Sequence, residues 1–420
     1  MDENKQNNIV EQVEENQTTP ETEEQVTTPE TANDTTVAAD KDADSLQSVD
    51  NRDKKSQIWG TIFFVVSIAL SIVLMLIFAS SYETGDNKDK HLGELFIEVF
   101  SNANLKYLLI SIATLCGMIL LDSLKYYTIM RATRVGAKYK TALTVGLLGK
   151  YYDYITPFSS GGQPMQIYYL HKKGIGGGES SAVIFIKFAF NMAMWLTICL
   201  CLMIFNRGAL LKYVTDATSL KLIQIGAWFG FAINCAVPIF IVACVILPKM
   251  TWAIARWVLK IGYKLKLVKD KDATLERTKN AVKSFVTAFR SMMKRPWHSI
   301  LLALLCIAEP LLGMVLPYFV VVALGGAAVT PSWDLLLAIM TLNVYVQMSV
   351  TVVPTPGNSG AMESAFMMTL VDISAGVLFW TVFSWRFLSY YSYIIIGLII
   401  TIVRFTKSAI RRKRAAKLLQ

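Results

Sequence analysis

Six ionisable side chains lie inside long apolar runs of the sequence. They are Asp122, Asp153, Lys187, Glu309, Glu363 and Arg386. Charge inside an apolar segment is costly, so such residues indicate either a site for a charged ligand or structural ion pairs. Lys187 and Arg386 have the chemistry to neutralise a phosphate, and both readings stay open for these two cations, as for Glu309 and Glu363. Asp122 lies near the end of its run beside Lys125, which favours a structural role.

Two stretches rich in proline and glycine interrupt apolar segments. The first is Thr156-Pro-Phe-Ser-Ser-Gly-Gly-Gln-Pro164 within 141–170, and the second is Val353-Pro-Thr-Pro-Gly-Asn-Ser-Gly-Ala-Met-Glu363 within 335–370. Proline removes a backbone donor and glycine permits unusual dihedral angles, so we expect helical hairpins with their tips at these points. A hairpin tip exposes a helix N-terminus, whose free N–H groups favour anions such as phosphate.

The predicted site combines the small polar residues of both tips with the charges in the neighbouring helices. Its members are Pro157, Ser159, Gly161, Gly162, Gln163, Lys187, Glu309, Pro356, Gly357, Asn358, Ser359, Gly360, Glu363 and Arg386. We predict that these residues bind the headgroup of a membrane lipid.

The composition indicates which elements must position these residues. The chain has 420 residues, of which 54% are hydrophobic and 17% charged, and this is typical of an integral membrane protein. A hydrocarbon core of about 30 Å requires about 20 apolar residues per helix. We therefore predict an all-α polytopic membrane protein with about six full transmembrane helices, at Ile58–Ala79, Leu105–Leu124, Ala182–Phe205, Leu222–Leu247, Ile300–Leu324 and Ile373–Val403.

Charge divides the chain into three predicted regions. Residues 1–50 carry 14 Asp and Glu against 2 Lys, so we expect 1–57 to be a disordered acidic cytoplasmic tail. We expect a transmembrane domain at 58–404 that includes a basic cytoplasmic segment, 249–298, and a basic cytoplasmic C-terminus at 405–420. Segments 125–140 and 249–295 are rich in Lys and Arg whereas 81–104 is acidic, so both termini are predicted to be cytoplasmic.

This orientation constrains the two broken segments. The first must begin and end on the cytoplasmic side and the second on the outer side, which favours two re-entrant hairpins dipping from opposite faces. Two short full crossings each, joined by ordinary turns outside the membrane, would satisfy the same constraint. Pro157 and Pro356, Gly161 and Gly360, and Lys187 and Arg386 share an offset of 199 residues. An inverted repeat is therefore predicted, and in transporters such repeats form the substrate site at their interface.

Several functional classes lack support in the sequence. All six cysteines lie in apolar runs and the three histidines are scattered, so neither a disulfide framework nor a metal site is indicated. No constellation typical of catalysis and no nucleic-acid motif is present, and we expect no cofactor. The segment 252–269 alternates aromatic and aliphatic residues with Lys and Arg, which predicts a basic helix on anionic lipid.

The two broken stretches resemble the signature segments of the lysylphosphatidylglycerol synthase transmembrane region. The resemblance covers about 55–405 and rests on Thr156 to Leu170 and Pro354 to Glu363. It implies a bacterial plasma-membrane protein that moves lipids between leaflets. It maps the family's prolines and glycines onto Pro157, Gly161, Gly162, Pro356, Gly357 and Gly360, and its acidic residue onto Glu363. Asn358 stands where a second glycine is common. We expect the transport region alone, without the aminoacyl transferase domain of the full synthases.

We therefore expect a lipid transporter or flippase for a phospholipid or glycolipid rather than an enzyme. The alternative is a scaffold that binds lipid without transporting it and presents it to a separate transferase. The expected partners are membrane lipids, namely an anionic phospholipid or a glycolipid. A separate lipid-modifying enzyme and a homodimer are left open as further partners.

Overall fold

The computed structural model of the protein describes residues 69, 73, 92–136, 138–264, 271–326, 329–374 and 377–417. All of them belong to one compact unit, Phe63–Gln420. The predicted acidic tail lies outside the described residues, as does nearly all of the first predicted span, Ile58–Ala79. Residues 418–420 of the predicted basic C-terminus also lie outside them.

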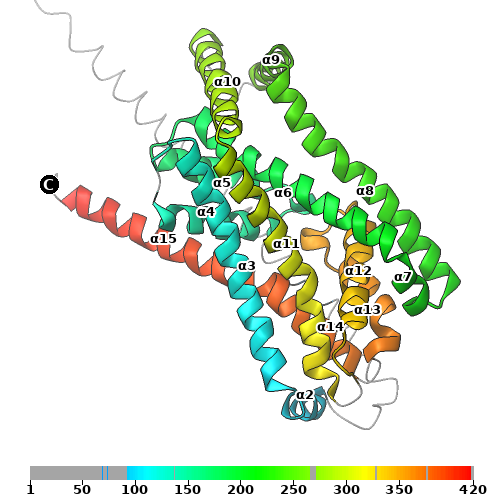
Figure 1. The fold of residues 1–420 in the computed structure, drawn as a ribbon. Helices are drawn as coiled ribbons and strands as arrows, with labels where there is room; N and C mark the ends of the chain where they lie inside the picture. Colours follow the sequence, from blue (N-terminus) through cyan, green and yellow to red (C-terminus); the bar gives the residue numbers. More distant parts are fainter. Residues whose placement is uncertain are drawn as a thin grey trace, which may run out of the picture. The chain divides into compact units, whose positions relative to one another are not determined.

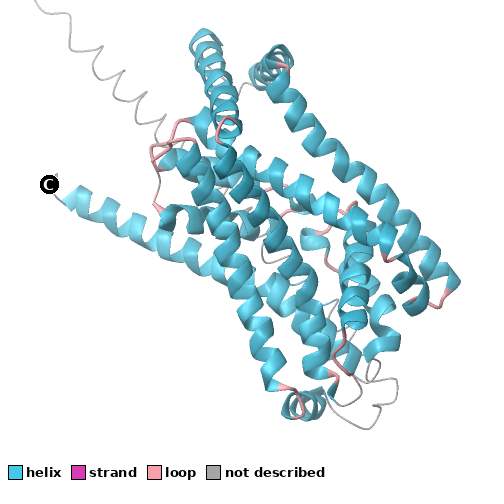
Figure 2. Cartoon of the chain, in the orientation of Figure 1, coloured by secondary structure: helices cyan, strands magenta, loops and turns pink. Residues whose placement is uncertain are grey.

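The described residues form helices and connecting loops, and no strand occurs among them (Figures 1 and 2). In chain order these are α2 (Leu92–Ser101), α3 (Leu105–Ala132), α4 (Tyr139–Ile155), the turn η1 (Pro157–Ser159), α5 (Gly162–Lys172), α6 (Gly177–Phe205), α7 (Arg207–Tyr213), α8 (Ala217–Ile246), α9 (Pro248–Lys264), α10 (Lys271–Met293), α11 (Pro296–Leu324), α12 (Trp333–Ser349), the turn η3 (Pro356–Asn358), α13 (Ala361–Ser374), α14 (Leu378–Arg386), the π-helical η5 (Phe387–Tyr391) and α15 (Ser392–Lys417). The predicted all-α class is confirmed.

Five helical segments are long and apolar enough to cross a membrane: α3, α6, α8, α11 and the continuous segment Leu378–Arg404. They match five of the six predicted segments, but several boundaries differ from the prediction, including the starts of α8 at Ala217 instead of Leu222 and of α11 at Pro296 instead of Ile300. Helix α3 extends beyond Leu124 to Ala132, and α6 begins at Gly177 instead of Ala182. The last span begins at Leu378, because α13 continues to Ser374.

The extension of α3 corrects the predicted role of one lysine. Lys125 was counted with the cytoplasmic positive charges, but it lies inside α3 and its side chain is completely buried. The reason is that α3 continues for about two turns beyond its most apolar stretch, so Lys125 packs within the bundle instead of reaching the lipid surface.

The element order of a long helix, a broken hairpin and a second long segment occurs twice. Helices α3 to α6 form the first set, and α11 to α15 form the second. The leading helices α3 and α11 pack together and run antiparallel (Figure 1). Asn104, before α3, donates to the carbonyl of Ala323 near the end of α11 at 2.7 Å. Arg295, before α11, donates to the carbonyl of Arg131 near the end of α3 at 3.5 Å.

The turns η1 and η3 have the same backbone conformation. Phe158 (φ 55°) and Ser159 (φ 50°) in η1 correspond to Gly357 (φ 56°) and Asn358 (φ 55°) in η3. Left-handed dihedral angles are uncommon outside glycine, so two successive ones at both turns are a specific shared feature. The offset between the matching residues is the 199 residues noted in the sequence.

The predicted basic helix is present in part as α9, which is followed by the second basic helix α10. The remainder of the prediction, 265–270, lies outside the described residues. Trp257 and Ile261 of α9 are exposed, and the guanidinium of Arg256 lies 5.6 Å from the ring centroid of Trp252. Helix α10 packs against the start of α6, where Gly178 approaches the carbonyl of Ala281 too closely to admit a side chain.

Candidate functional site

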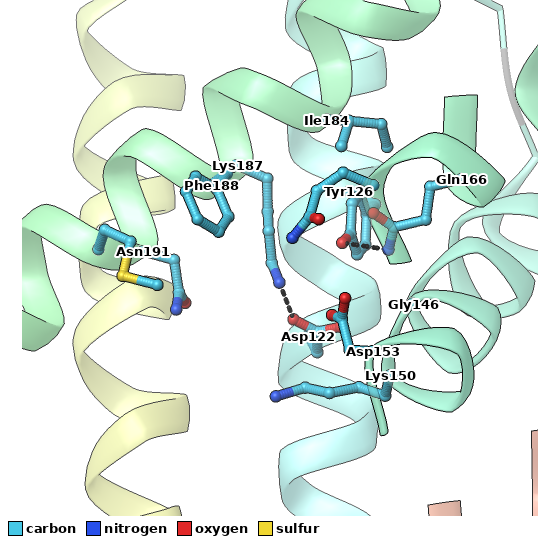
Figure 3. A pocket seen from close by; sticks show the side chains of 12 residues that line it. Asp122, Tyr126, Gly146, Lys150, Asp153, Gln166, Ile184, Lys187, Phe188 and Asn191 are labelled. Atoms are coloured by element: carbon cyan, nitrogen blue, oxygen red, sulfur yellow. Dashed lines mark hydrogen bonds and ion pairs between the residues drawn. The ribbon is translucent and has the colours of Figure 1, made fainter. Parts of the chain in front are cut away.

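A polar cavity of about 130 Å³ lies between α3, α4, α5 and α6 (Figure 3). Its lining residues are Asp122, Tyr126, Gly146, Lys150, Asp153, Gln163, Gln166, Ile184, Lys187, Phe188, Asn191 and Met192. The helices approach closely here because small residues face their neighbours. A side chain at Gly146 would meet the carboxylate of Asp122, and one at Gly149 would overlap Gln166. Volumes of this size hold several waters or a phosphate group.

Two ion pairs beside the cavity connect α3 to α6 and to α11. The ammonium of Lys187 lies 2.9 Å from Oδ1 of Asp122, which joins α6 to α3. The ammonium of Lys125 lies 2.8 Å from Oε2 of Glu309, which joins α3 to α11. Lys125 also lies 3.7 Å from Asp122 and donates to the side-chain oxygen of Asn191. The two pairs therefore form one network that crosses from the first set of helices to the second.

This network satisfies charges that would otherwise be very unfavourable at this depth in the bundle. Lys125 is completely buried, and Asp122 and Glu309 are each 5% exposed. Breaking a buried ion pair by removing one partner costs about 3–5 kcal/mol. The network consequently stabilises the packing of α3 against α6 and α11, whatever else it does.

The polar residues around Lys187 are fixed by further contacts. Its ammonium lies 5.1 Å from the ring centroid of Tyr126. The amide of Gln166, which is 4% exposed, donates to the hydroxyl of Tyr126 at 2.7 Å and to the carbonyl of Val145 at 3.0 Å. One wall of the cavity is thereby held rigid before any ligand binds.

Lys150 and Asp153 face the cavity from α4, three residues apart. Oδ1 of Asp153 accepts the backbone N–H of Gly162, at the start of α5, at 2.9 Å. Among the described residues, no carboxylate lies within ion-pair distance of the Lys150 ammonium. Figure 3 shows its side chain extending across the cavity below Asp122 and Asp153.

The second hairpin is organised around Arg386 at the end of α14. Its Nε donates to Oε1 of Glu363 at 2.6 Å and its Nη2 donates to the carbonyl of Gly357 at 3.0 Å. The other carboxylate oxygen of Glu363 accepts the backbone N–H of Gly360 at 2.7 Å. Arg386 is 4% exposed. Its guanidinium therefore holds the tip of its own hairpin through buried hydrogen bonds.

The two helix N-termini at the tips are therefore capped by carboxylates of their own hairpins. Asp153 caps the start of α5 and Glu363 caps the start of α13. A negative side chain at this position satisfies free N–H groups and complements the helix dipole. The N–H groups that it accepts are not available to an incoming phosphate.

The two tips contact each other, and Tyr390 of η5 lies at their junction. Its hydroxyl lies 3.2 Å from the carbonyl of Tyr154 in α4 and 3.4 Å from the carbonyl of Pro356 in η3. The hydroxyl of Tyr154 in turn donates to the carbonyl of Ser389 at 3.1 Å. The π-helical turn in the last span thus occurs where the span bonds both hairpins.

The predicted site residues divide into two groups. Gln163 and Lys187 line the cavity, and Glu309 joins them through Lys125. Gly357, Ser359, Gly360, Glu363 and Arg386 form the second cluster. Pro157 and Ser159 belong to η1, Gly161 and Gly162 begin α5, and Pro356 and Asn358 belong to η3. Lys187 and Arg386 do not line one common cavity among the described residues.

Sequence reasoning missed several residues of the cavity. The chief omission is Lys150, which lies in the first broken segment, one turn before Asp153. The same criterion that selected Asp153, a charge within an apolar segment, would have selected it. By contrast, Asn191 and Gln166 are ordinary polar residues of helices, and nothing in their spacing marks them.

A sequence model of the family described as "Lysylphosphatidylglycerol synthase TM region" matches residues 64–397. The match includes the cavity, both broken hairpins and all five apolar helical segments, except residues 398–404 at the end of the last one. The family resemblance noted in the sequence is confirmed. No curated protein matches the chain, and no solved structure matches it.

Proposed function

Because the chain belongs to the lysylphosphatidylglycerol synthase TM region family, and is thus a lipid-related membrane protein, we propose that it moves a lipid headgroup between the leaflets of a bacterial plasma membrane. The lipid is a phospholipid or a glycolipid. Its headgroup occupies the polar cavity between α3, α4, α5 and α6 while its acyl chains remain in the bilayer.

One observation carries this proposal: a charged cavity lies beside two helices of membrane-spanning length, α3 and α6. Asp122 and Lys187 line it from the interior of α3 and α6, and Lys150 and Asp153 line it from α4. Ionisable groups at such depth are expensive, and in membrane proteins they mark pathways for polar substrates. A headgroup crossing the hydrocarbon core requires a polar chamber of this kind, because its own desolvation would otherwise be prohibitive.

We infer that the two broken hairpins are re-entrant and belong to an inverted repeat. Helix α5 has 11 residues and α13 has 14. At about 1.5 Å per residue neither spans a core of about 30 Å. The antiparallel pairing of α3 with α11 and the matching turns η1 and η3 support opposite entry of the two hairpins. The basic helices α9 and α10 then lie on the cytoplasmic side, with both termini.

In this mechanism the residues have different tasks. Lys187 and Asp122 form the polar wall that replaces water around the headgroup, and Gln163 lies at the mouth of the first hairpin. Arg386 and Glu363 hold the second tip in shape instead of contacting the headgroup. Transport requires the cavity to open alternately to each side, and relative motion of the two hairpins at Tyr390 supplies that change.

Reconstitution tests the proposal directly. Purified protein in vesicles that contain fluorescent headgroup-labelled phospholipids or glycolipids should speed their exchange between leaflets, measured by a membrane-impermeant quencher. Asp122→Asn should slow exchange, and Lys172→Gln, an exposed lysine on the same hairpin, serves as the matched control. Vesicles in which no phospholipid or glycolipid moves faster than in protein-free controls, with or without ion gradients, would contradict the proposal.

A non-transporting scaffold is the second candidate, and one observation favours it. The tips of the hairpins are bonded to each other through Tyr390, which is an arrangement suited to a fixed lipid seat. In that case the protein would present bound lipid to a separate enzyme. Lipid that co-purifies stoichiometrically while exchange stays at the background rate would favour the scaffold.

A further inference from the structure

The charges around the cavity are not equally available to a ligand. Lys187 is paired with Asp122 at 2.9 Å, and Lys125 is paired with Glu309 at 2.8 Å. Binding an anion at either lysine would compete with an existing ion pair. Arg386, the other predicted cation, is bonded to Glu363 and the tip of the second hairpin.

Lys150 differs from these three cations. It lines the cavity, is only partly exposed, and donates no hydrogen bond to any described residue. The buried carboxylates Glu309 and Asp122 already have other cationic partners, Lys125 at 2.8 Å and Lys187 at 2.9 Å. A partly desolvated ammonium without an acceptor is unfavourable, and a bound anion removes that cost.

A second observation concerns a buried donor on α15, the helix that packs against α4. The hydroxyl of Tyr393 in α15 has no hydrogen-bond partner in the described part of the chain, although the residue is only 3% exposed. The ring centroid of Tyr393 lies 5.9 Å from that of Tyr154, which is one turn after Lys150 on α4. Two donors without acceptors among the described residues therefore lie on helices that pack together, α4 and α15, and a phosphate oxygen has the chemistry to satisfy either.

We propose that Lys150 is the anion-binding residue of this cavity and that it takes the singly charged phosphate of a phosphodiester. This inference rests on the proposed function, because it identifies the headgroup chemistry of the same site. At the tips, Asp153 and Glu363 already accept the backbone N–H groups of Gly162 and Gly360, so those two N–H groups are not open to an anion.

The position of Asp153 explains why the site should prefer a phosphate with one negative charge to a phosphate with two. The carboxylate of Asp153 lines the cavity one turn from Lys150. Within the described part of the chain its one hydrogen bond is accepted from the N–H of Gly162, which carries no full charge. A doubly charged phosphate would place its second charge near this carboxylate, and like charges in a poorly solvated site repel strongly. A phosphodiester gains the attraction of Lys150 without that repulsion.

Binding of short-chain probes to protein in a maltoside detergent tests the inference. One probe, dihexanoyl phosphatidylglycerol, is a phosphodiester. Two others, dihexanoyl phosphatidic acid and inorganic phosphate, are not diesters, and the fourth, dihexanoylglycerol, is uncharged. The wild type should bind the diester most tightly. Lys150→Gln should raise its dissociation constant about tenfold, which is the loss expected for one charge-assisted hydrogen bond. Lys150→Arg should stay within about threefold of the wild type, and Lys172→Gln should be unchanged.

Asp153→Asn supplies a test that does not depend on the lysine variants folding well. This variant should reduce the difference in dissociation constant between the diester and phosphatidic acid, because the negative charge that repels the second phosphate charge is removed. Unchanged diester binding in Lys150→Gln, or equal wild-type affinity for inorganic phosphate and the diester, would overturn the proposal. Diester binding that depends on Lys150 in a protein that moves no lipid would retain this inference and reject the transport function.

Discussion

The hydroxyl of Tyr390 donates to the backbone carbonyl of Tyr154 across 3.2 Å, and their ring centroids lie 5.0 Å apart. This contact joins the last span to the first hairpin, although the two residues are separated by 236 positions in the chain. The same hydroxyl lies 3.4 Å from the carbonyl of Pro356 in the second hairpin. The hydroxyl of Tyr390 therefore lies within hydrogen-bond distance of both hairpins.

Removing this hydroxyl should loosen the junction without unfolding the protein. We expect Tyr390→Phe to lower the free energy of unfolding by about 1 kcal/mol, the usual net value of a hydrogen bond. If the hairpins must separate during transport, lipid exchange should become faster or slower by several fold while binding of lipid is retained. Exchange and thermal unfolding measured on the same preparation check this, and an unaltered exchange rate would exclude Tyr390 from the moving junction.

Gly357 should not tolerate a side chain. Its φ is 56°, and a Cβ atom there would lie 2.1 Å from the ring of Tyr390. A left-handed alanine costs about 1 kcal/mol before the clash is counted, so Gly357→Ala should lower the thermal midpoint by several degrees or abolish folded yield. Gly208→Ala is the control, because its Cβ would meet no atom within 4 Å. Equal stability of the two variants would contradict the close packing of η3 against Tyr390.

The pair Lys125–Glu309 should be essential for stability. Lys125→Met would leave the Glu309 carboxylate buried without its cation, and we expect a loss of about 3–5 kcal/mol. The double variant Lys125→Met with Glu309→Gln should recover part of that loss, because the orphaned charge is also removed. Thermal unfolding of the two single variants and the double variant measures the coupling, and strict additivity would mean that the pair does not interact.

We expect that Arg386→Lys does not preserve the stability of the protein. The guanidinium donates through Nε to Glu363 and through Nη2 to the carbonyl of Gly357, and one ammonium cannot reproduce that planar fork. Arg386→Lys should therefore lose nearly as much stability as Arg386→Gln. A lysine variant as stable as the wild type would show that only the positive charge matters.

Lys187→Gln should reduce lipid exchange much more than it reduces the stability of the fold. The variant leaves Asp122 with the more distant Lys125, at 3.7 Å, as its remaining partner, so we expect a moderate loss of stability and a large loss of lipid exchange. Lys187→Arg keeps the charge and should retain most of both. Exchange rates normalised to folded protein provide the measurement, and full activity in Lys187→Gln would remove this residue from the site.

The sequence determined the helices of this protein but not the partners of its charges. Apolar runs of about 20 residues predict spans because each helix satisfies its own backbone hydrogen bonds, and five helical segments long and apolar enough to cross a membrane are present. Proline and glycine marked both turns for an equally local reason. These features depend on residues close together in the chain.

Only the tertiary structure decided which charges are engaged and which are available. Lys125 was assigned to the cytoplasmic surface and proved to be buried against Glu309, 184 positions away. Lys187 and Arg386 looked equivalent, yet Lys187 lines a cavity and Arg386 clasps a hairpin. The sequence analysis did not select Lys150. What distinguishes this lysine is that it has no ion-pair partner among the described residues. Ion pairing depends on distances of a few ångströms between helices that are remote in the chain, and spacing along the sequence does not encode those distances.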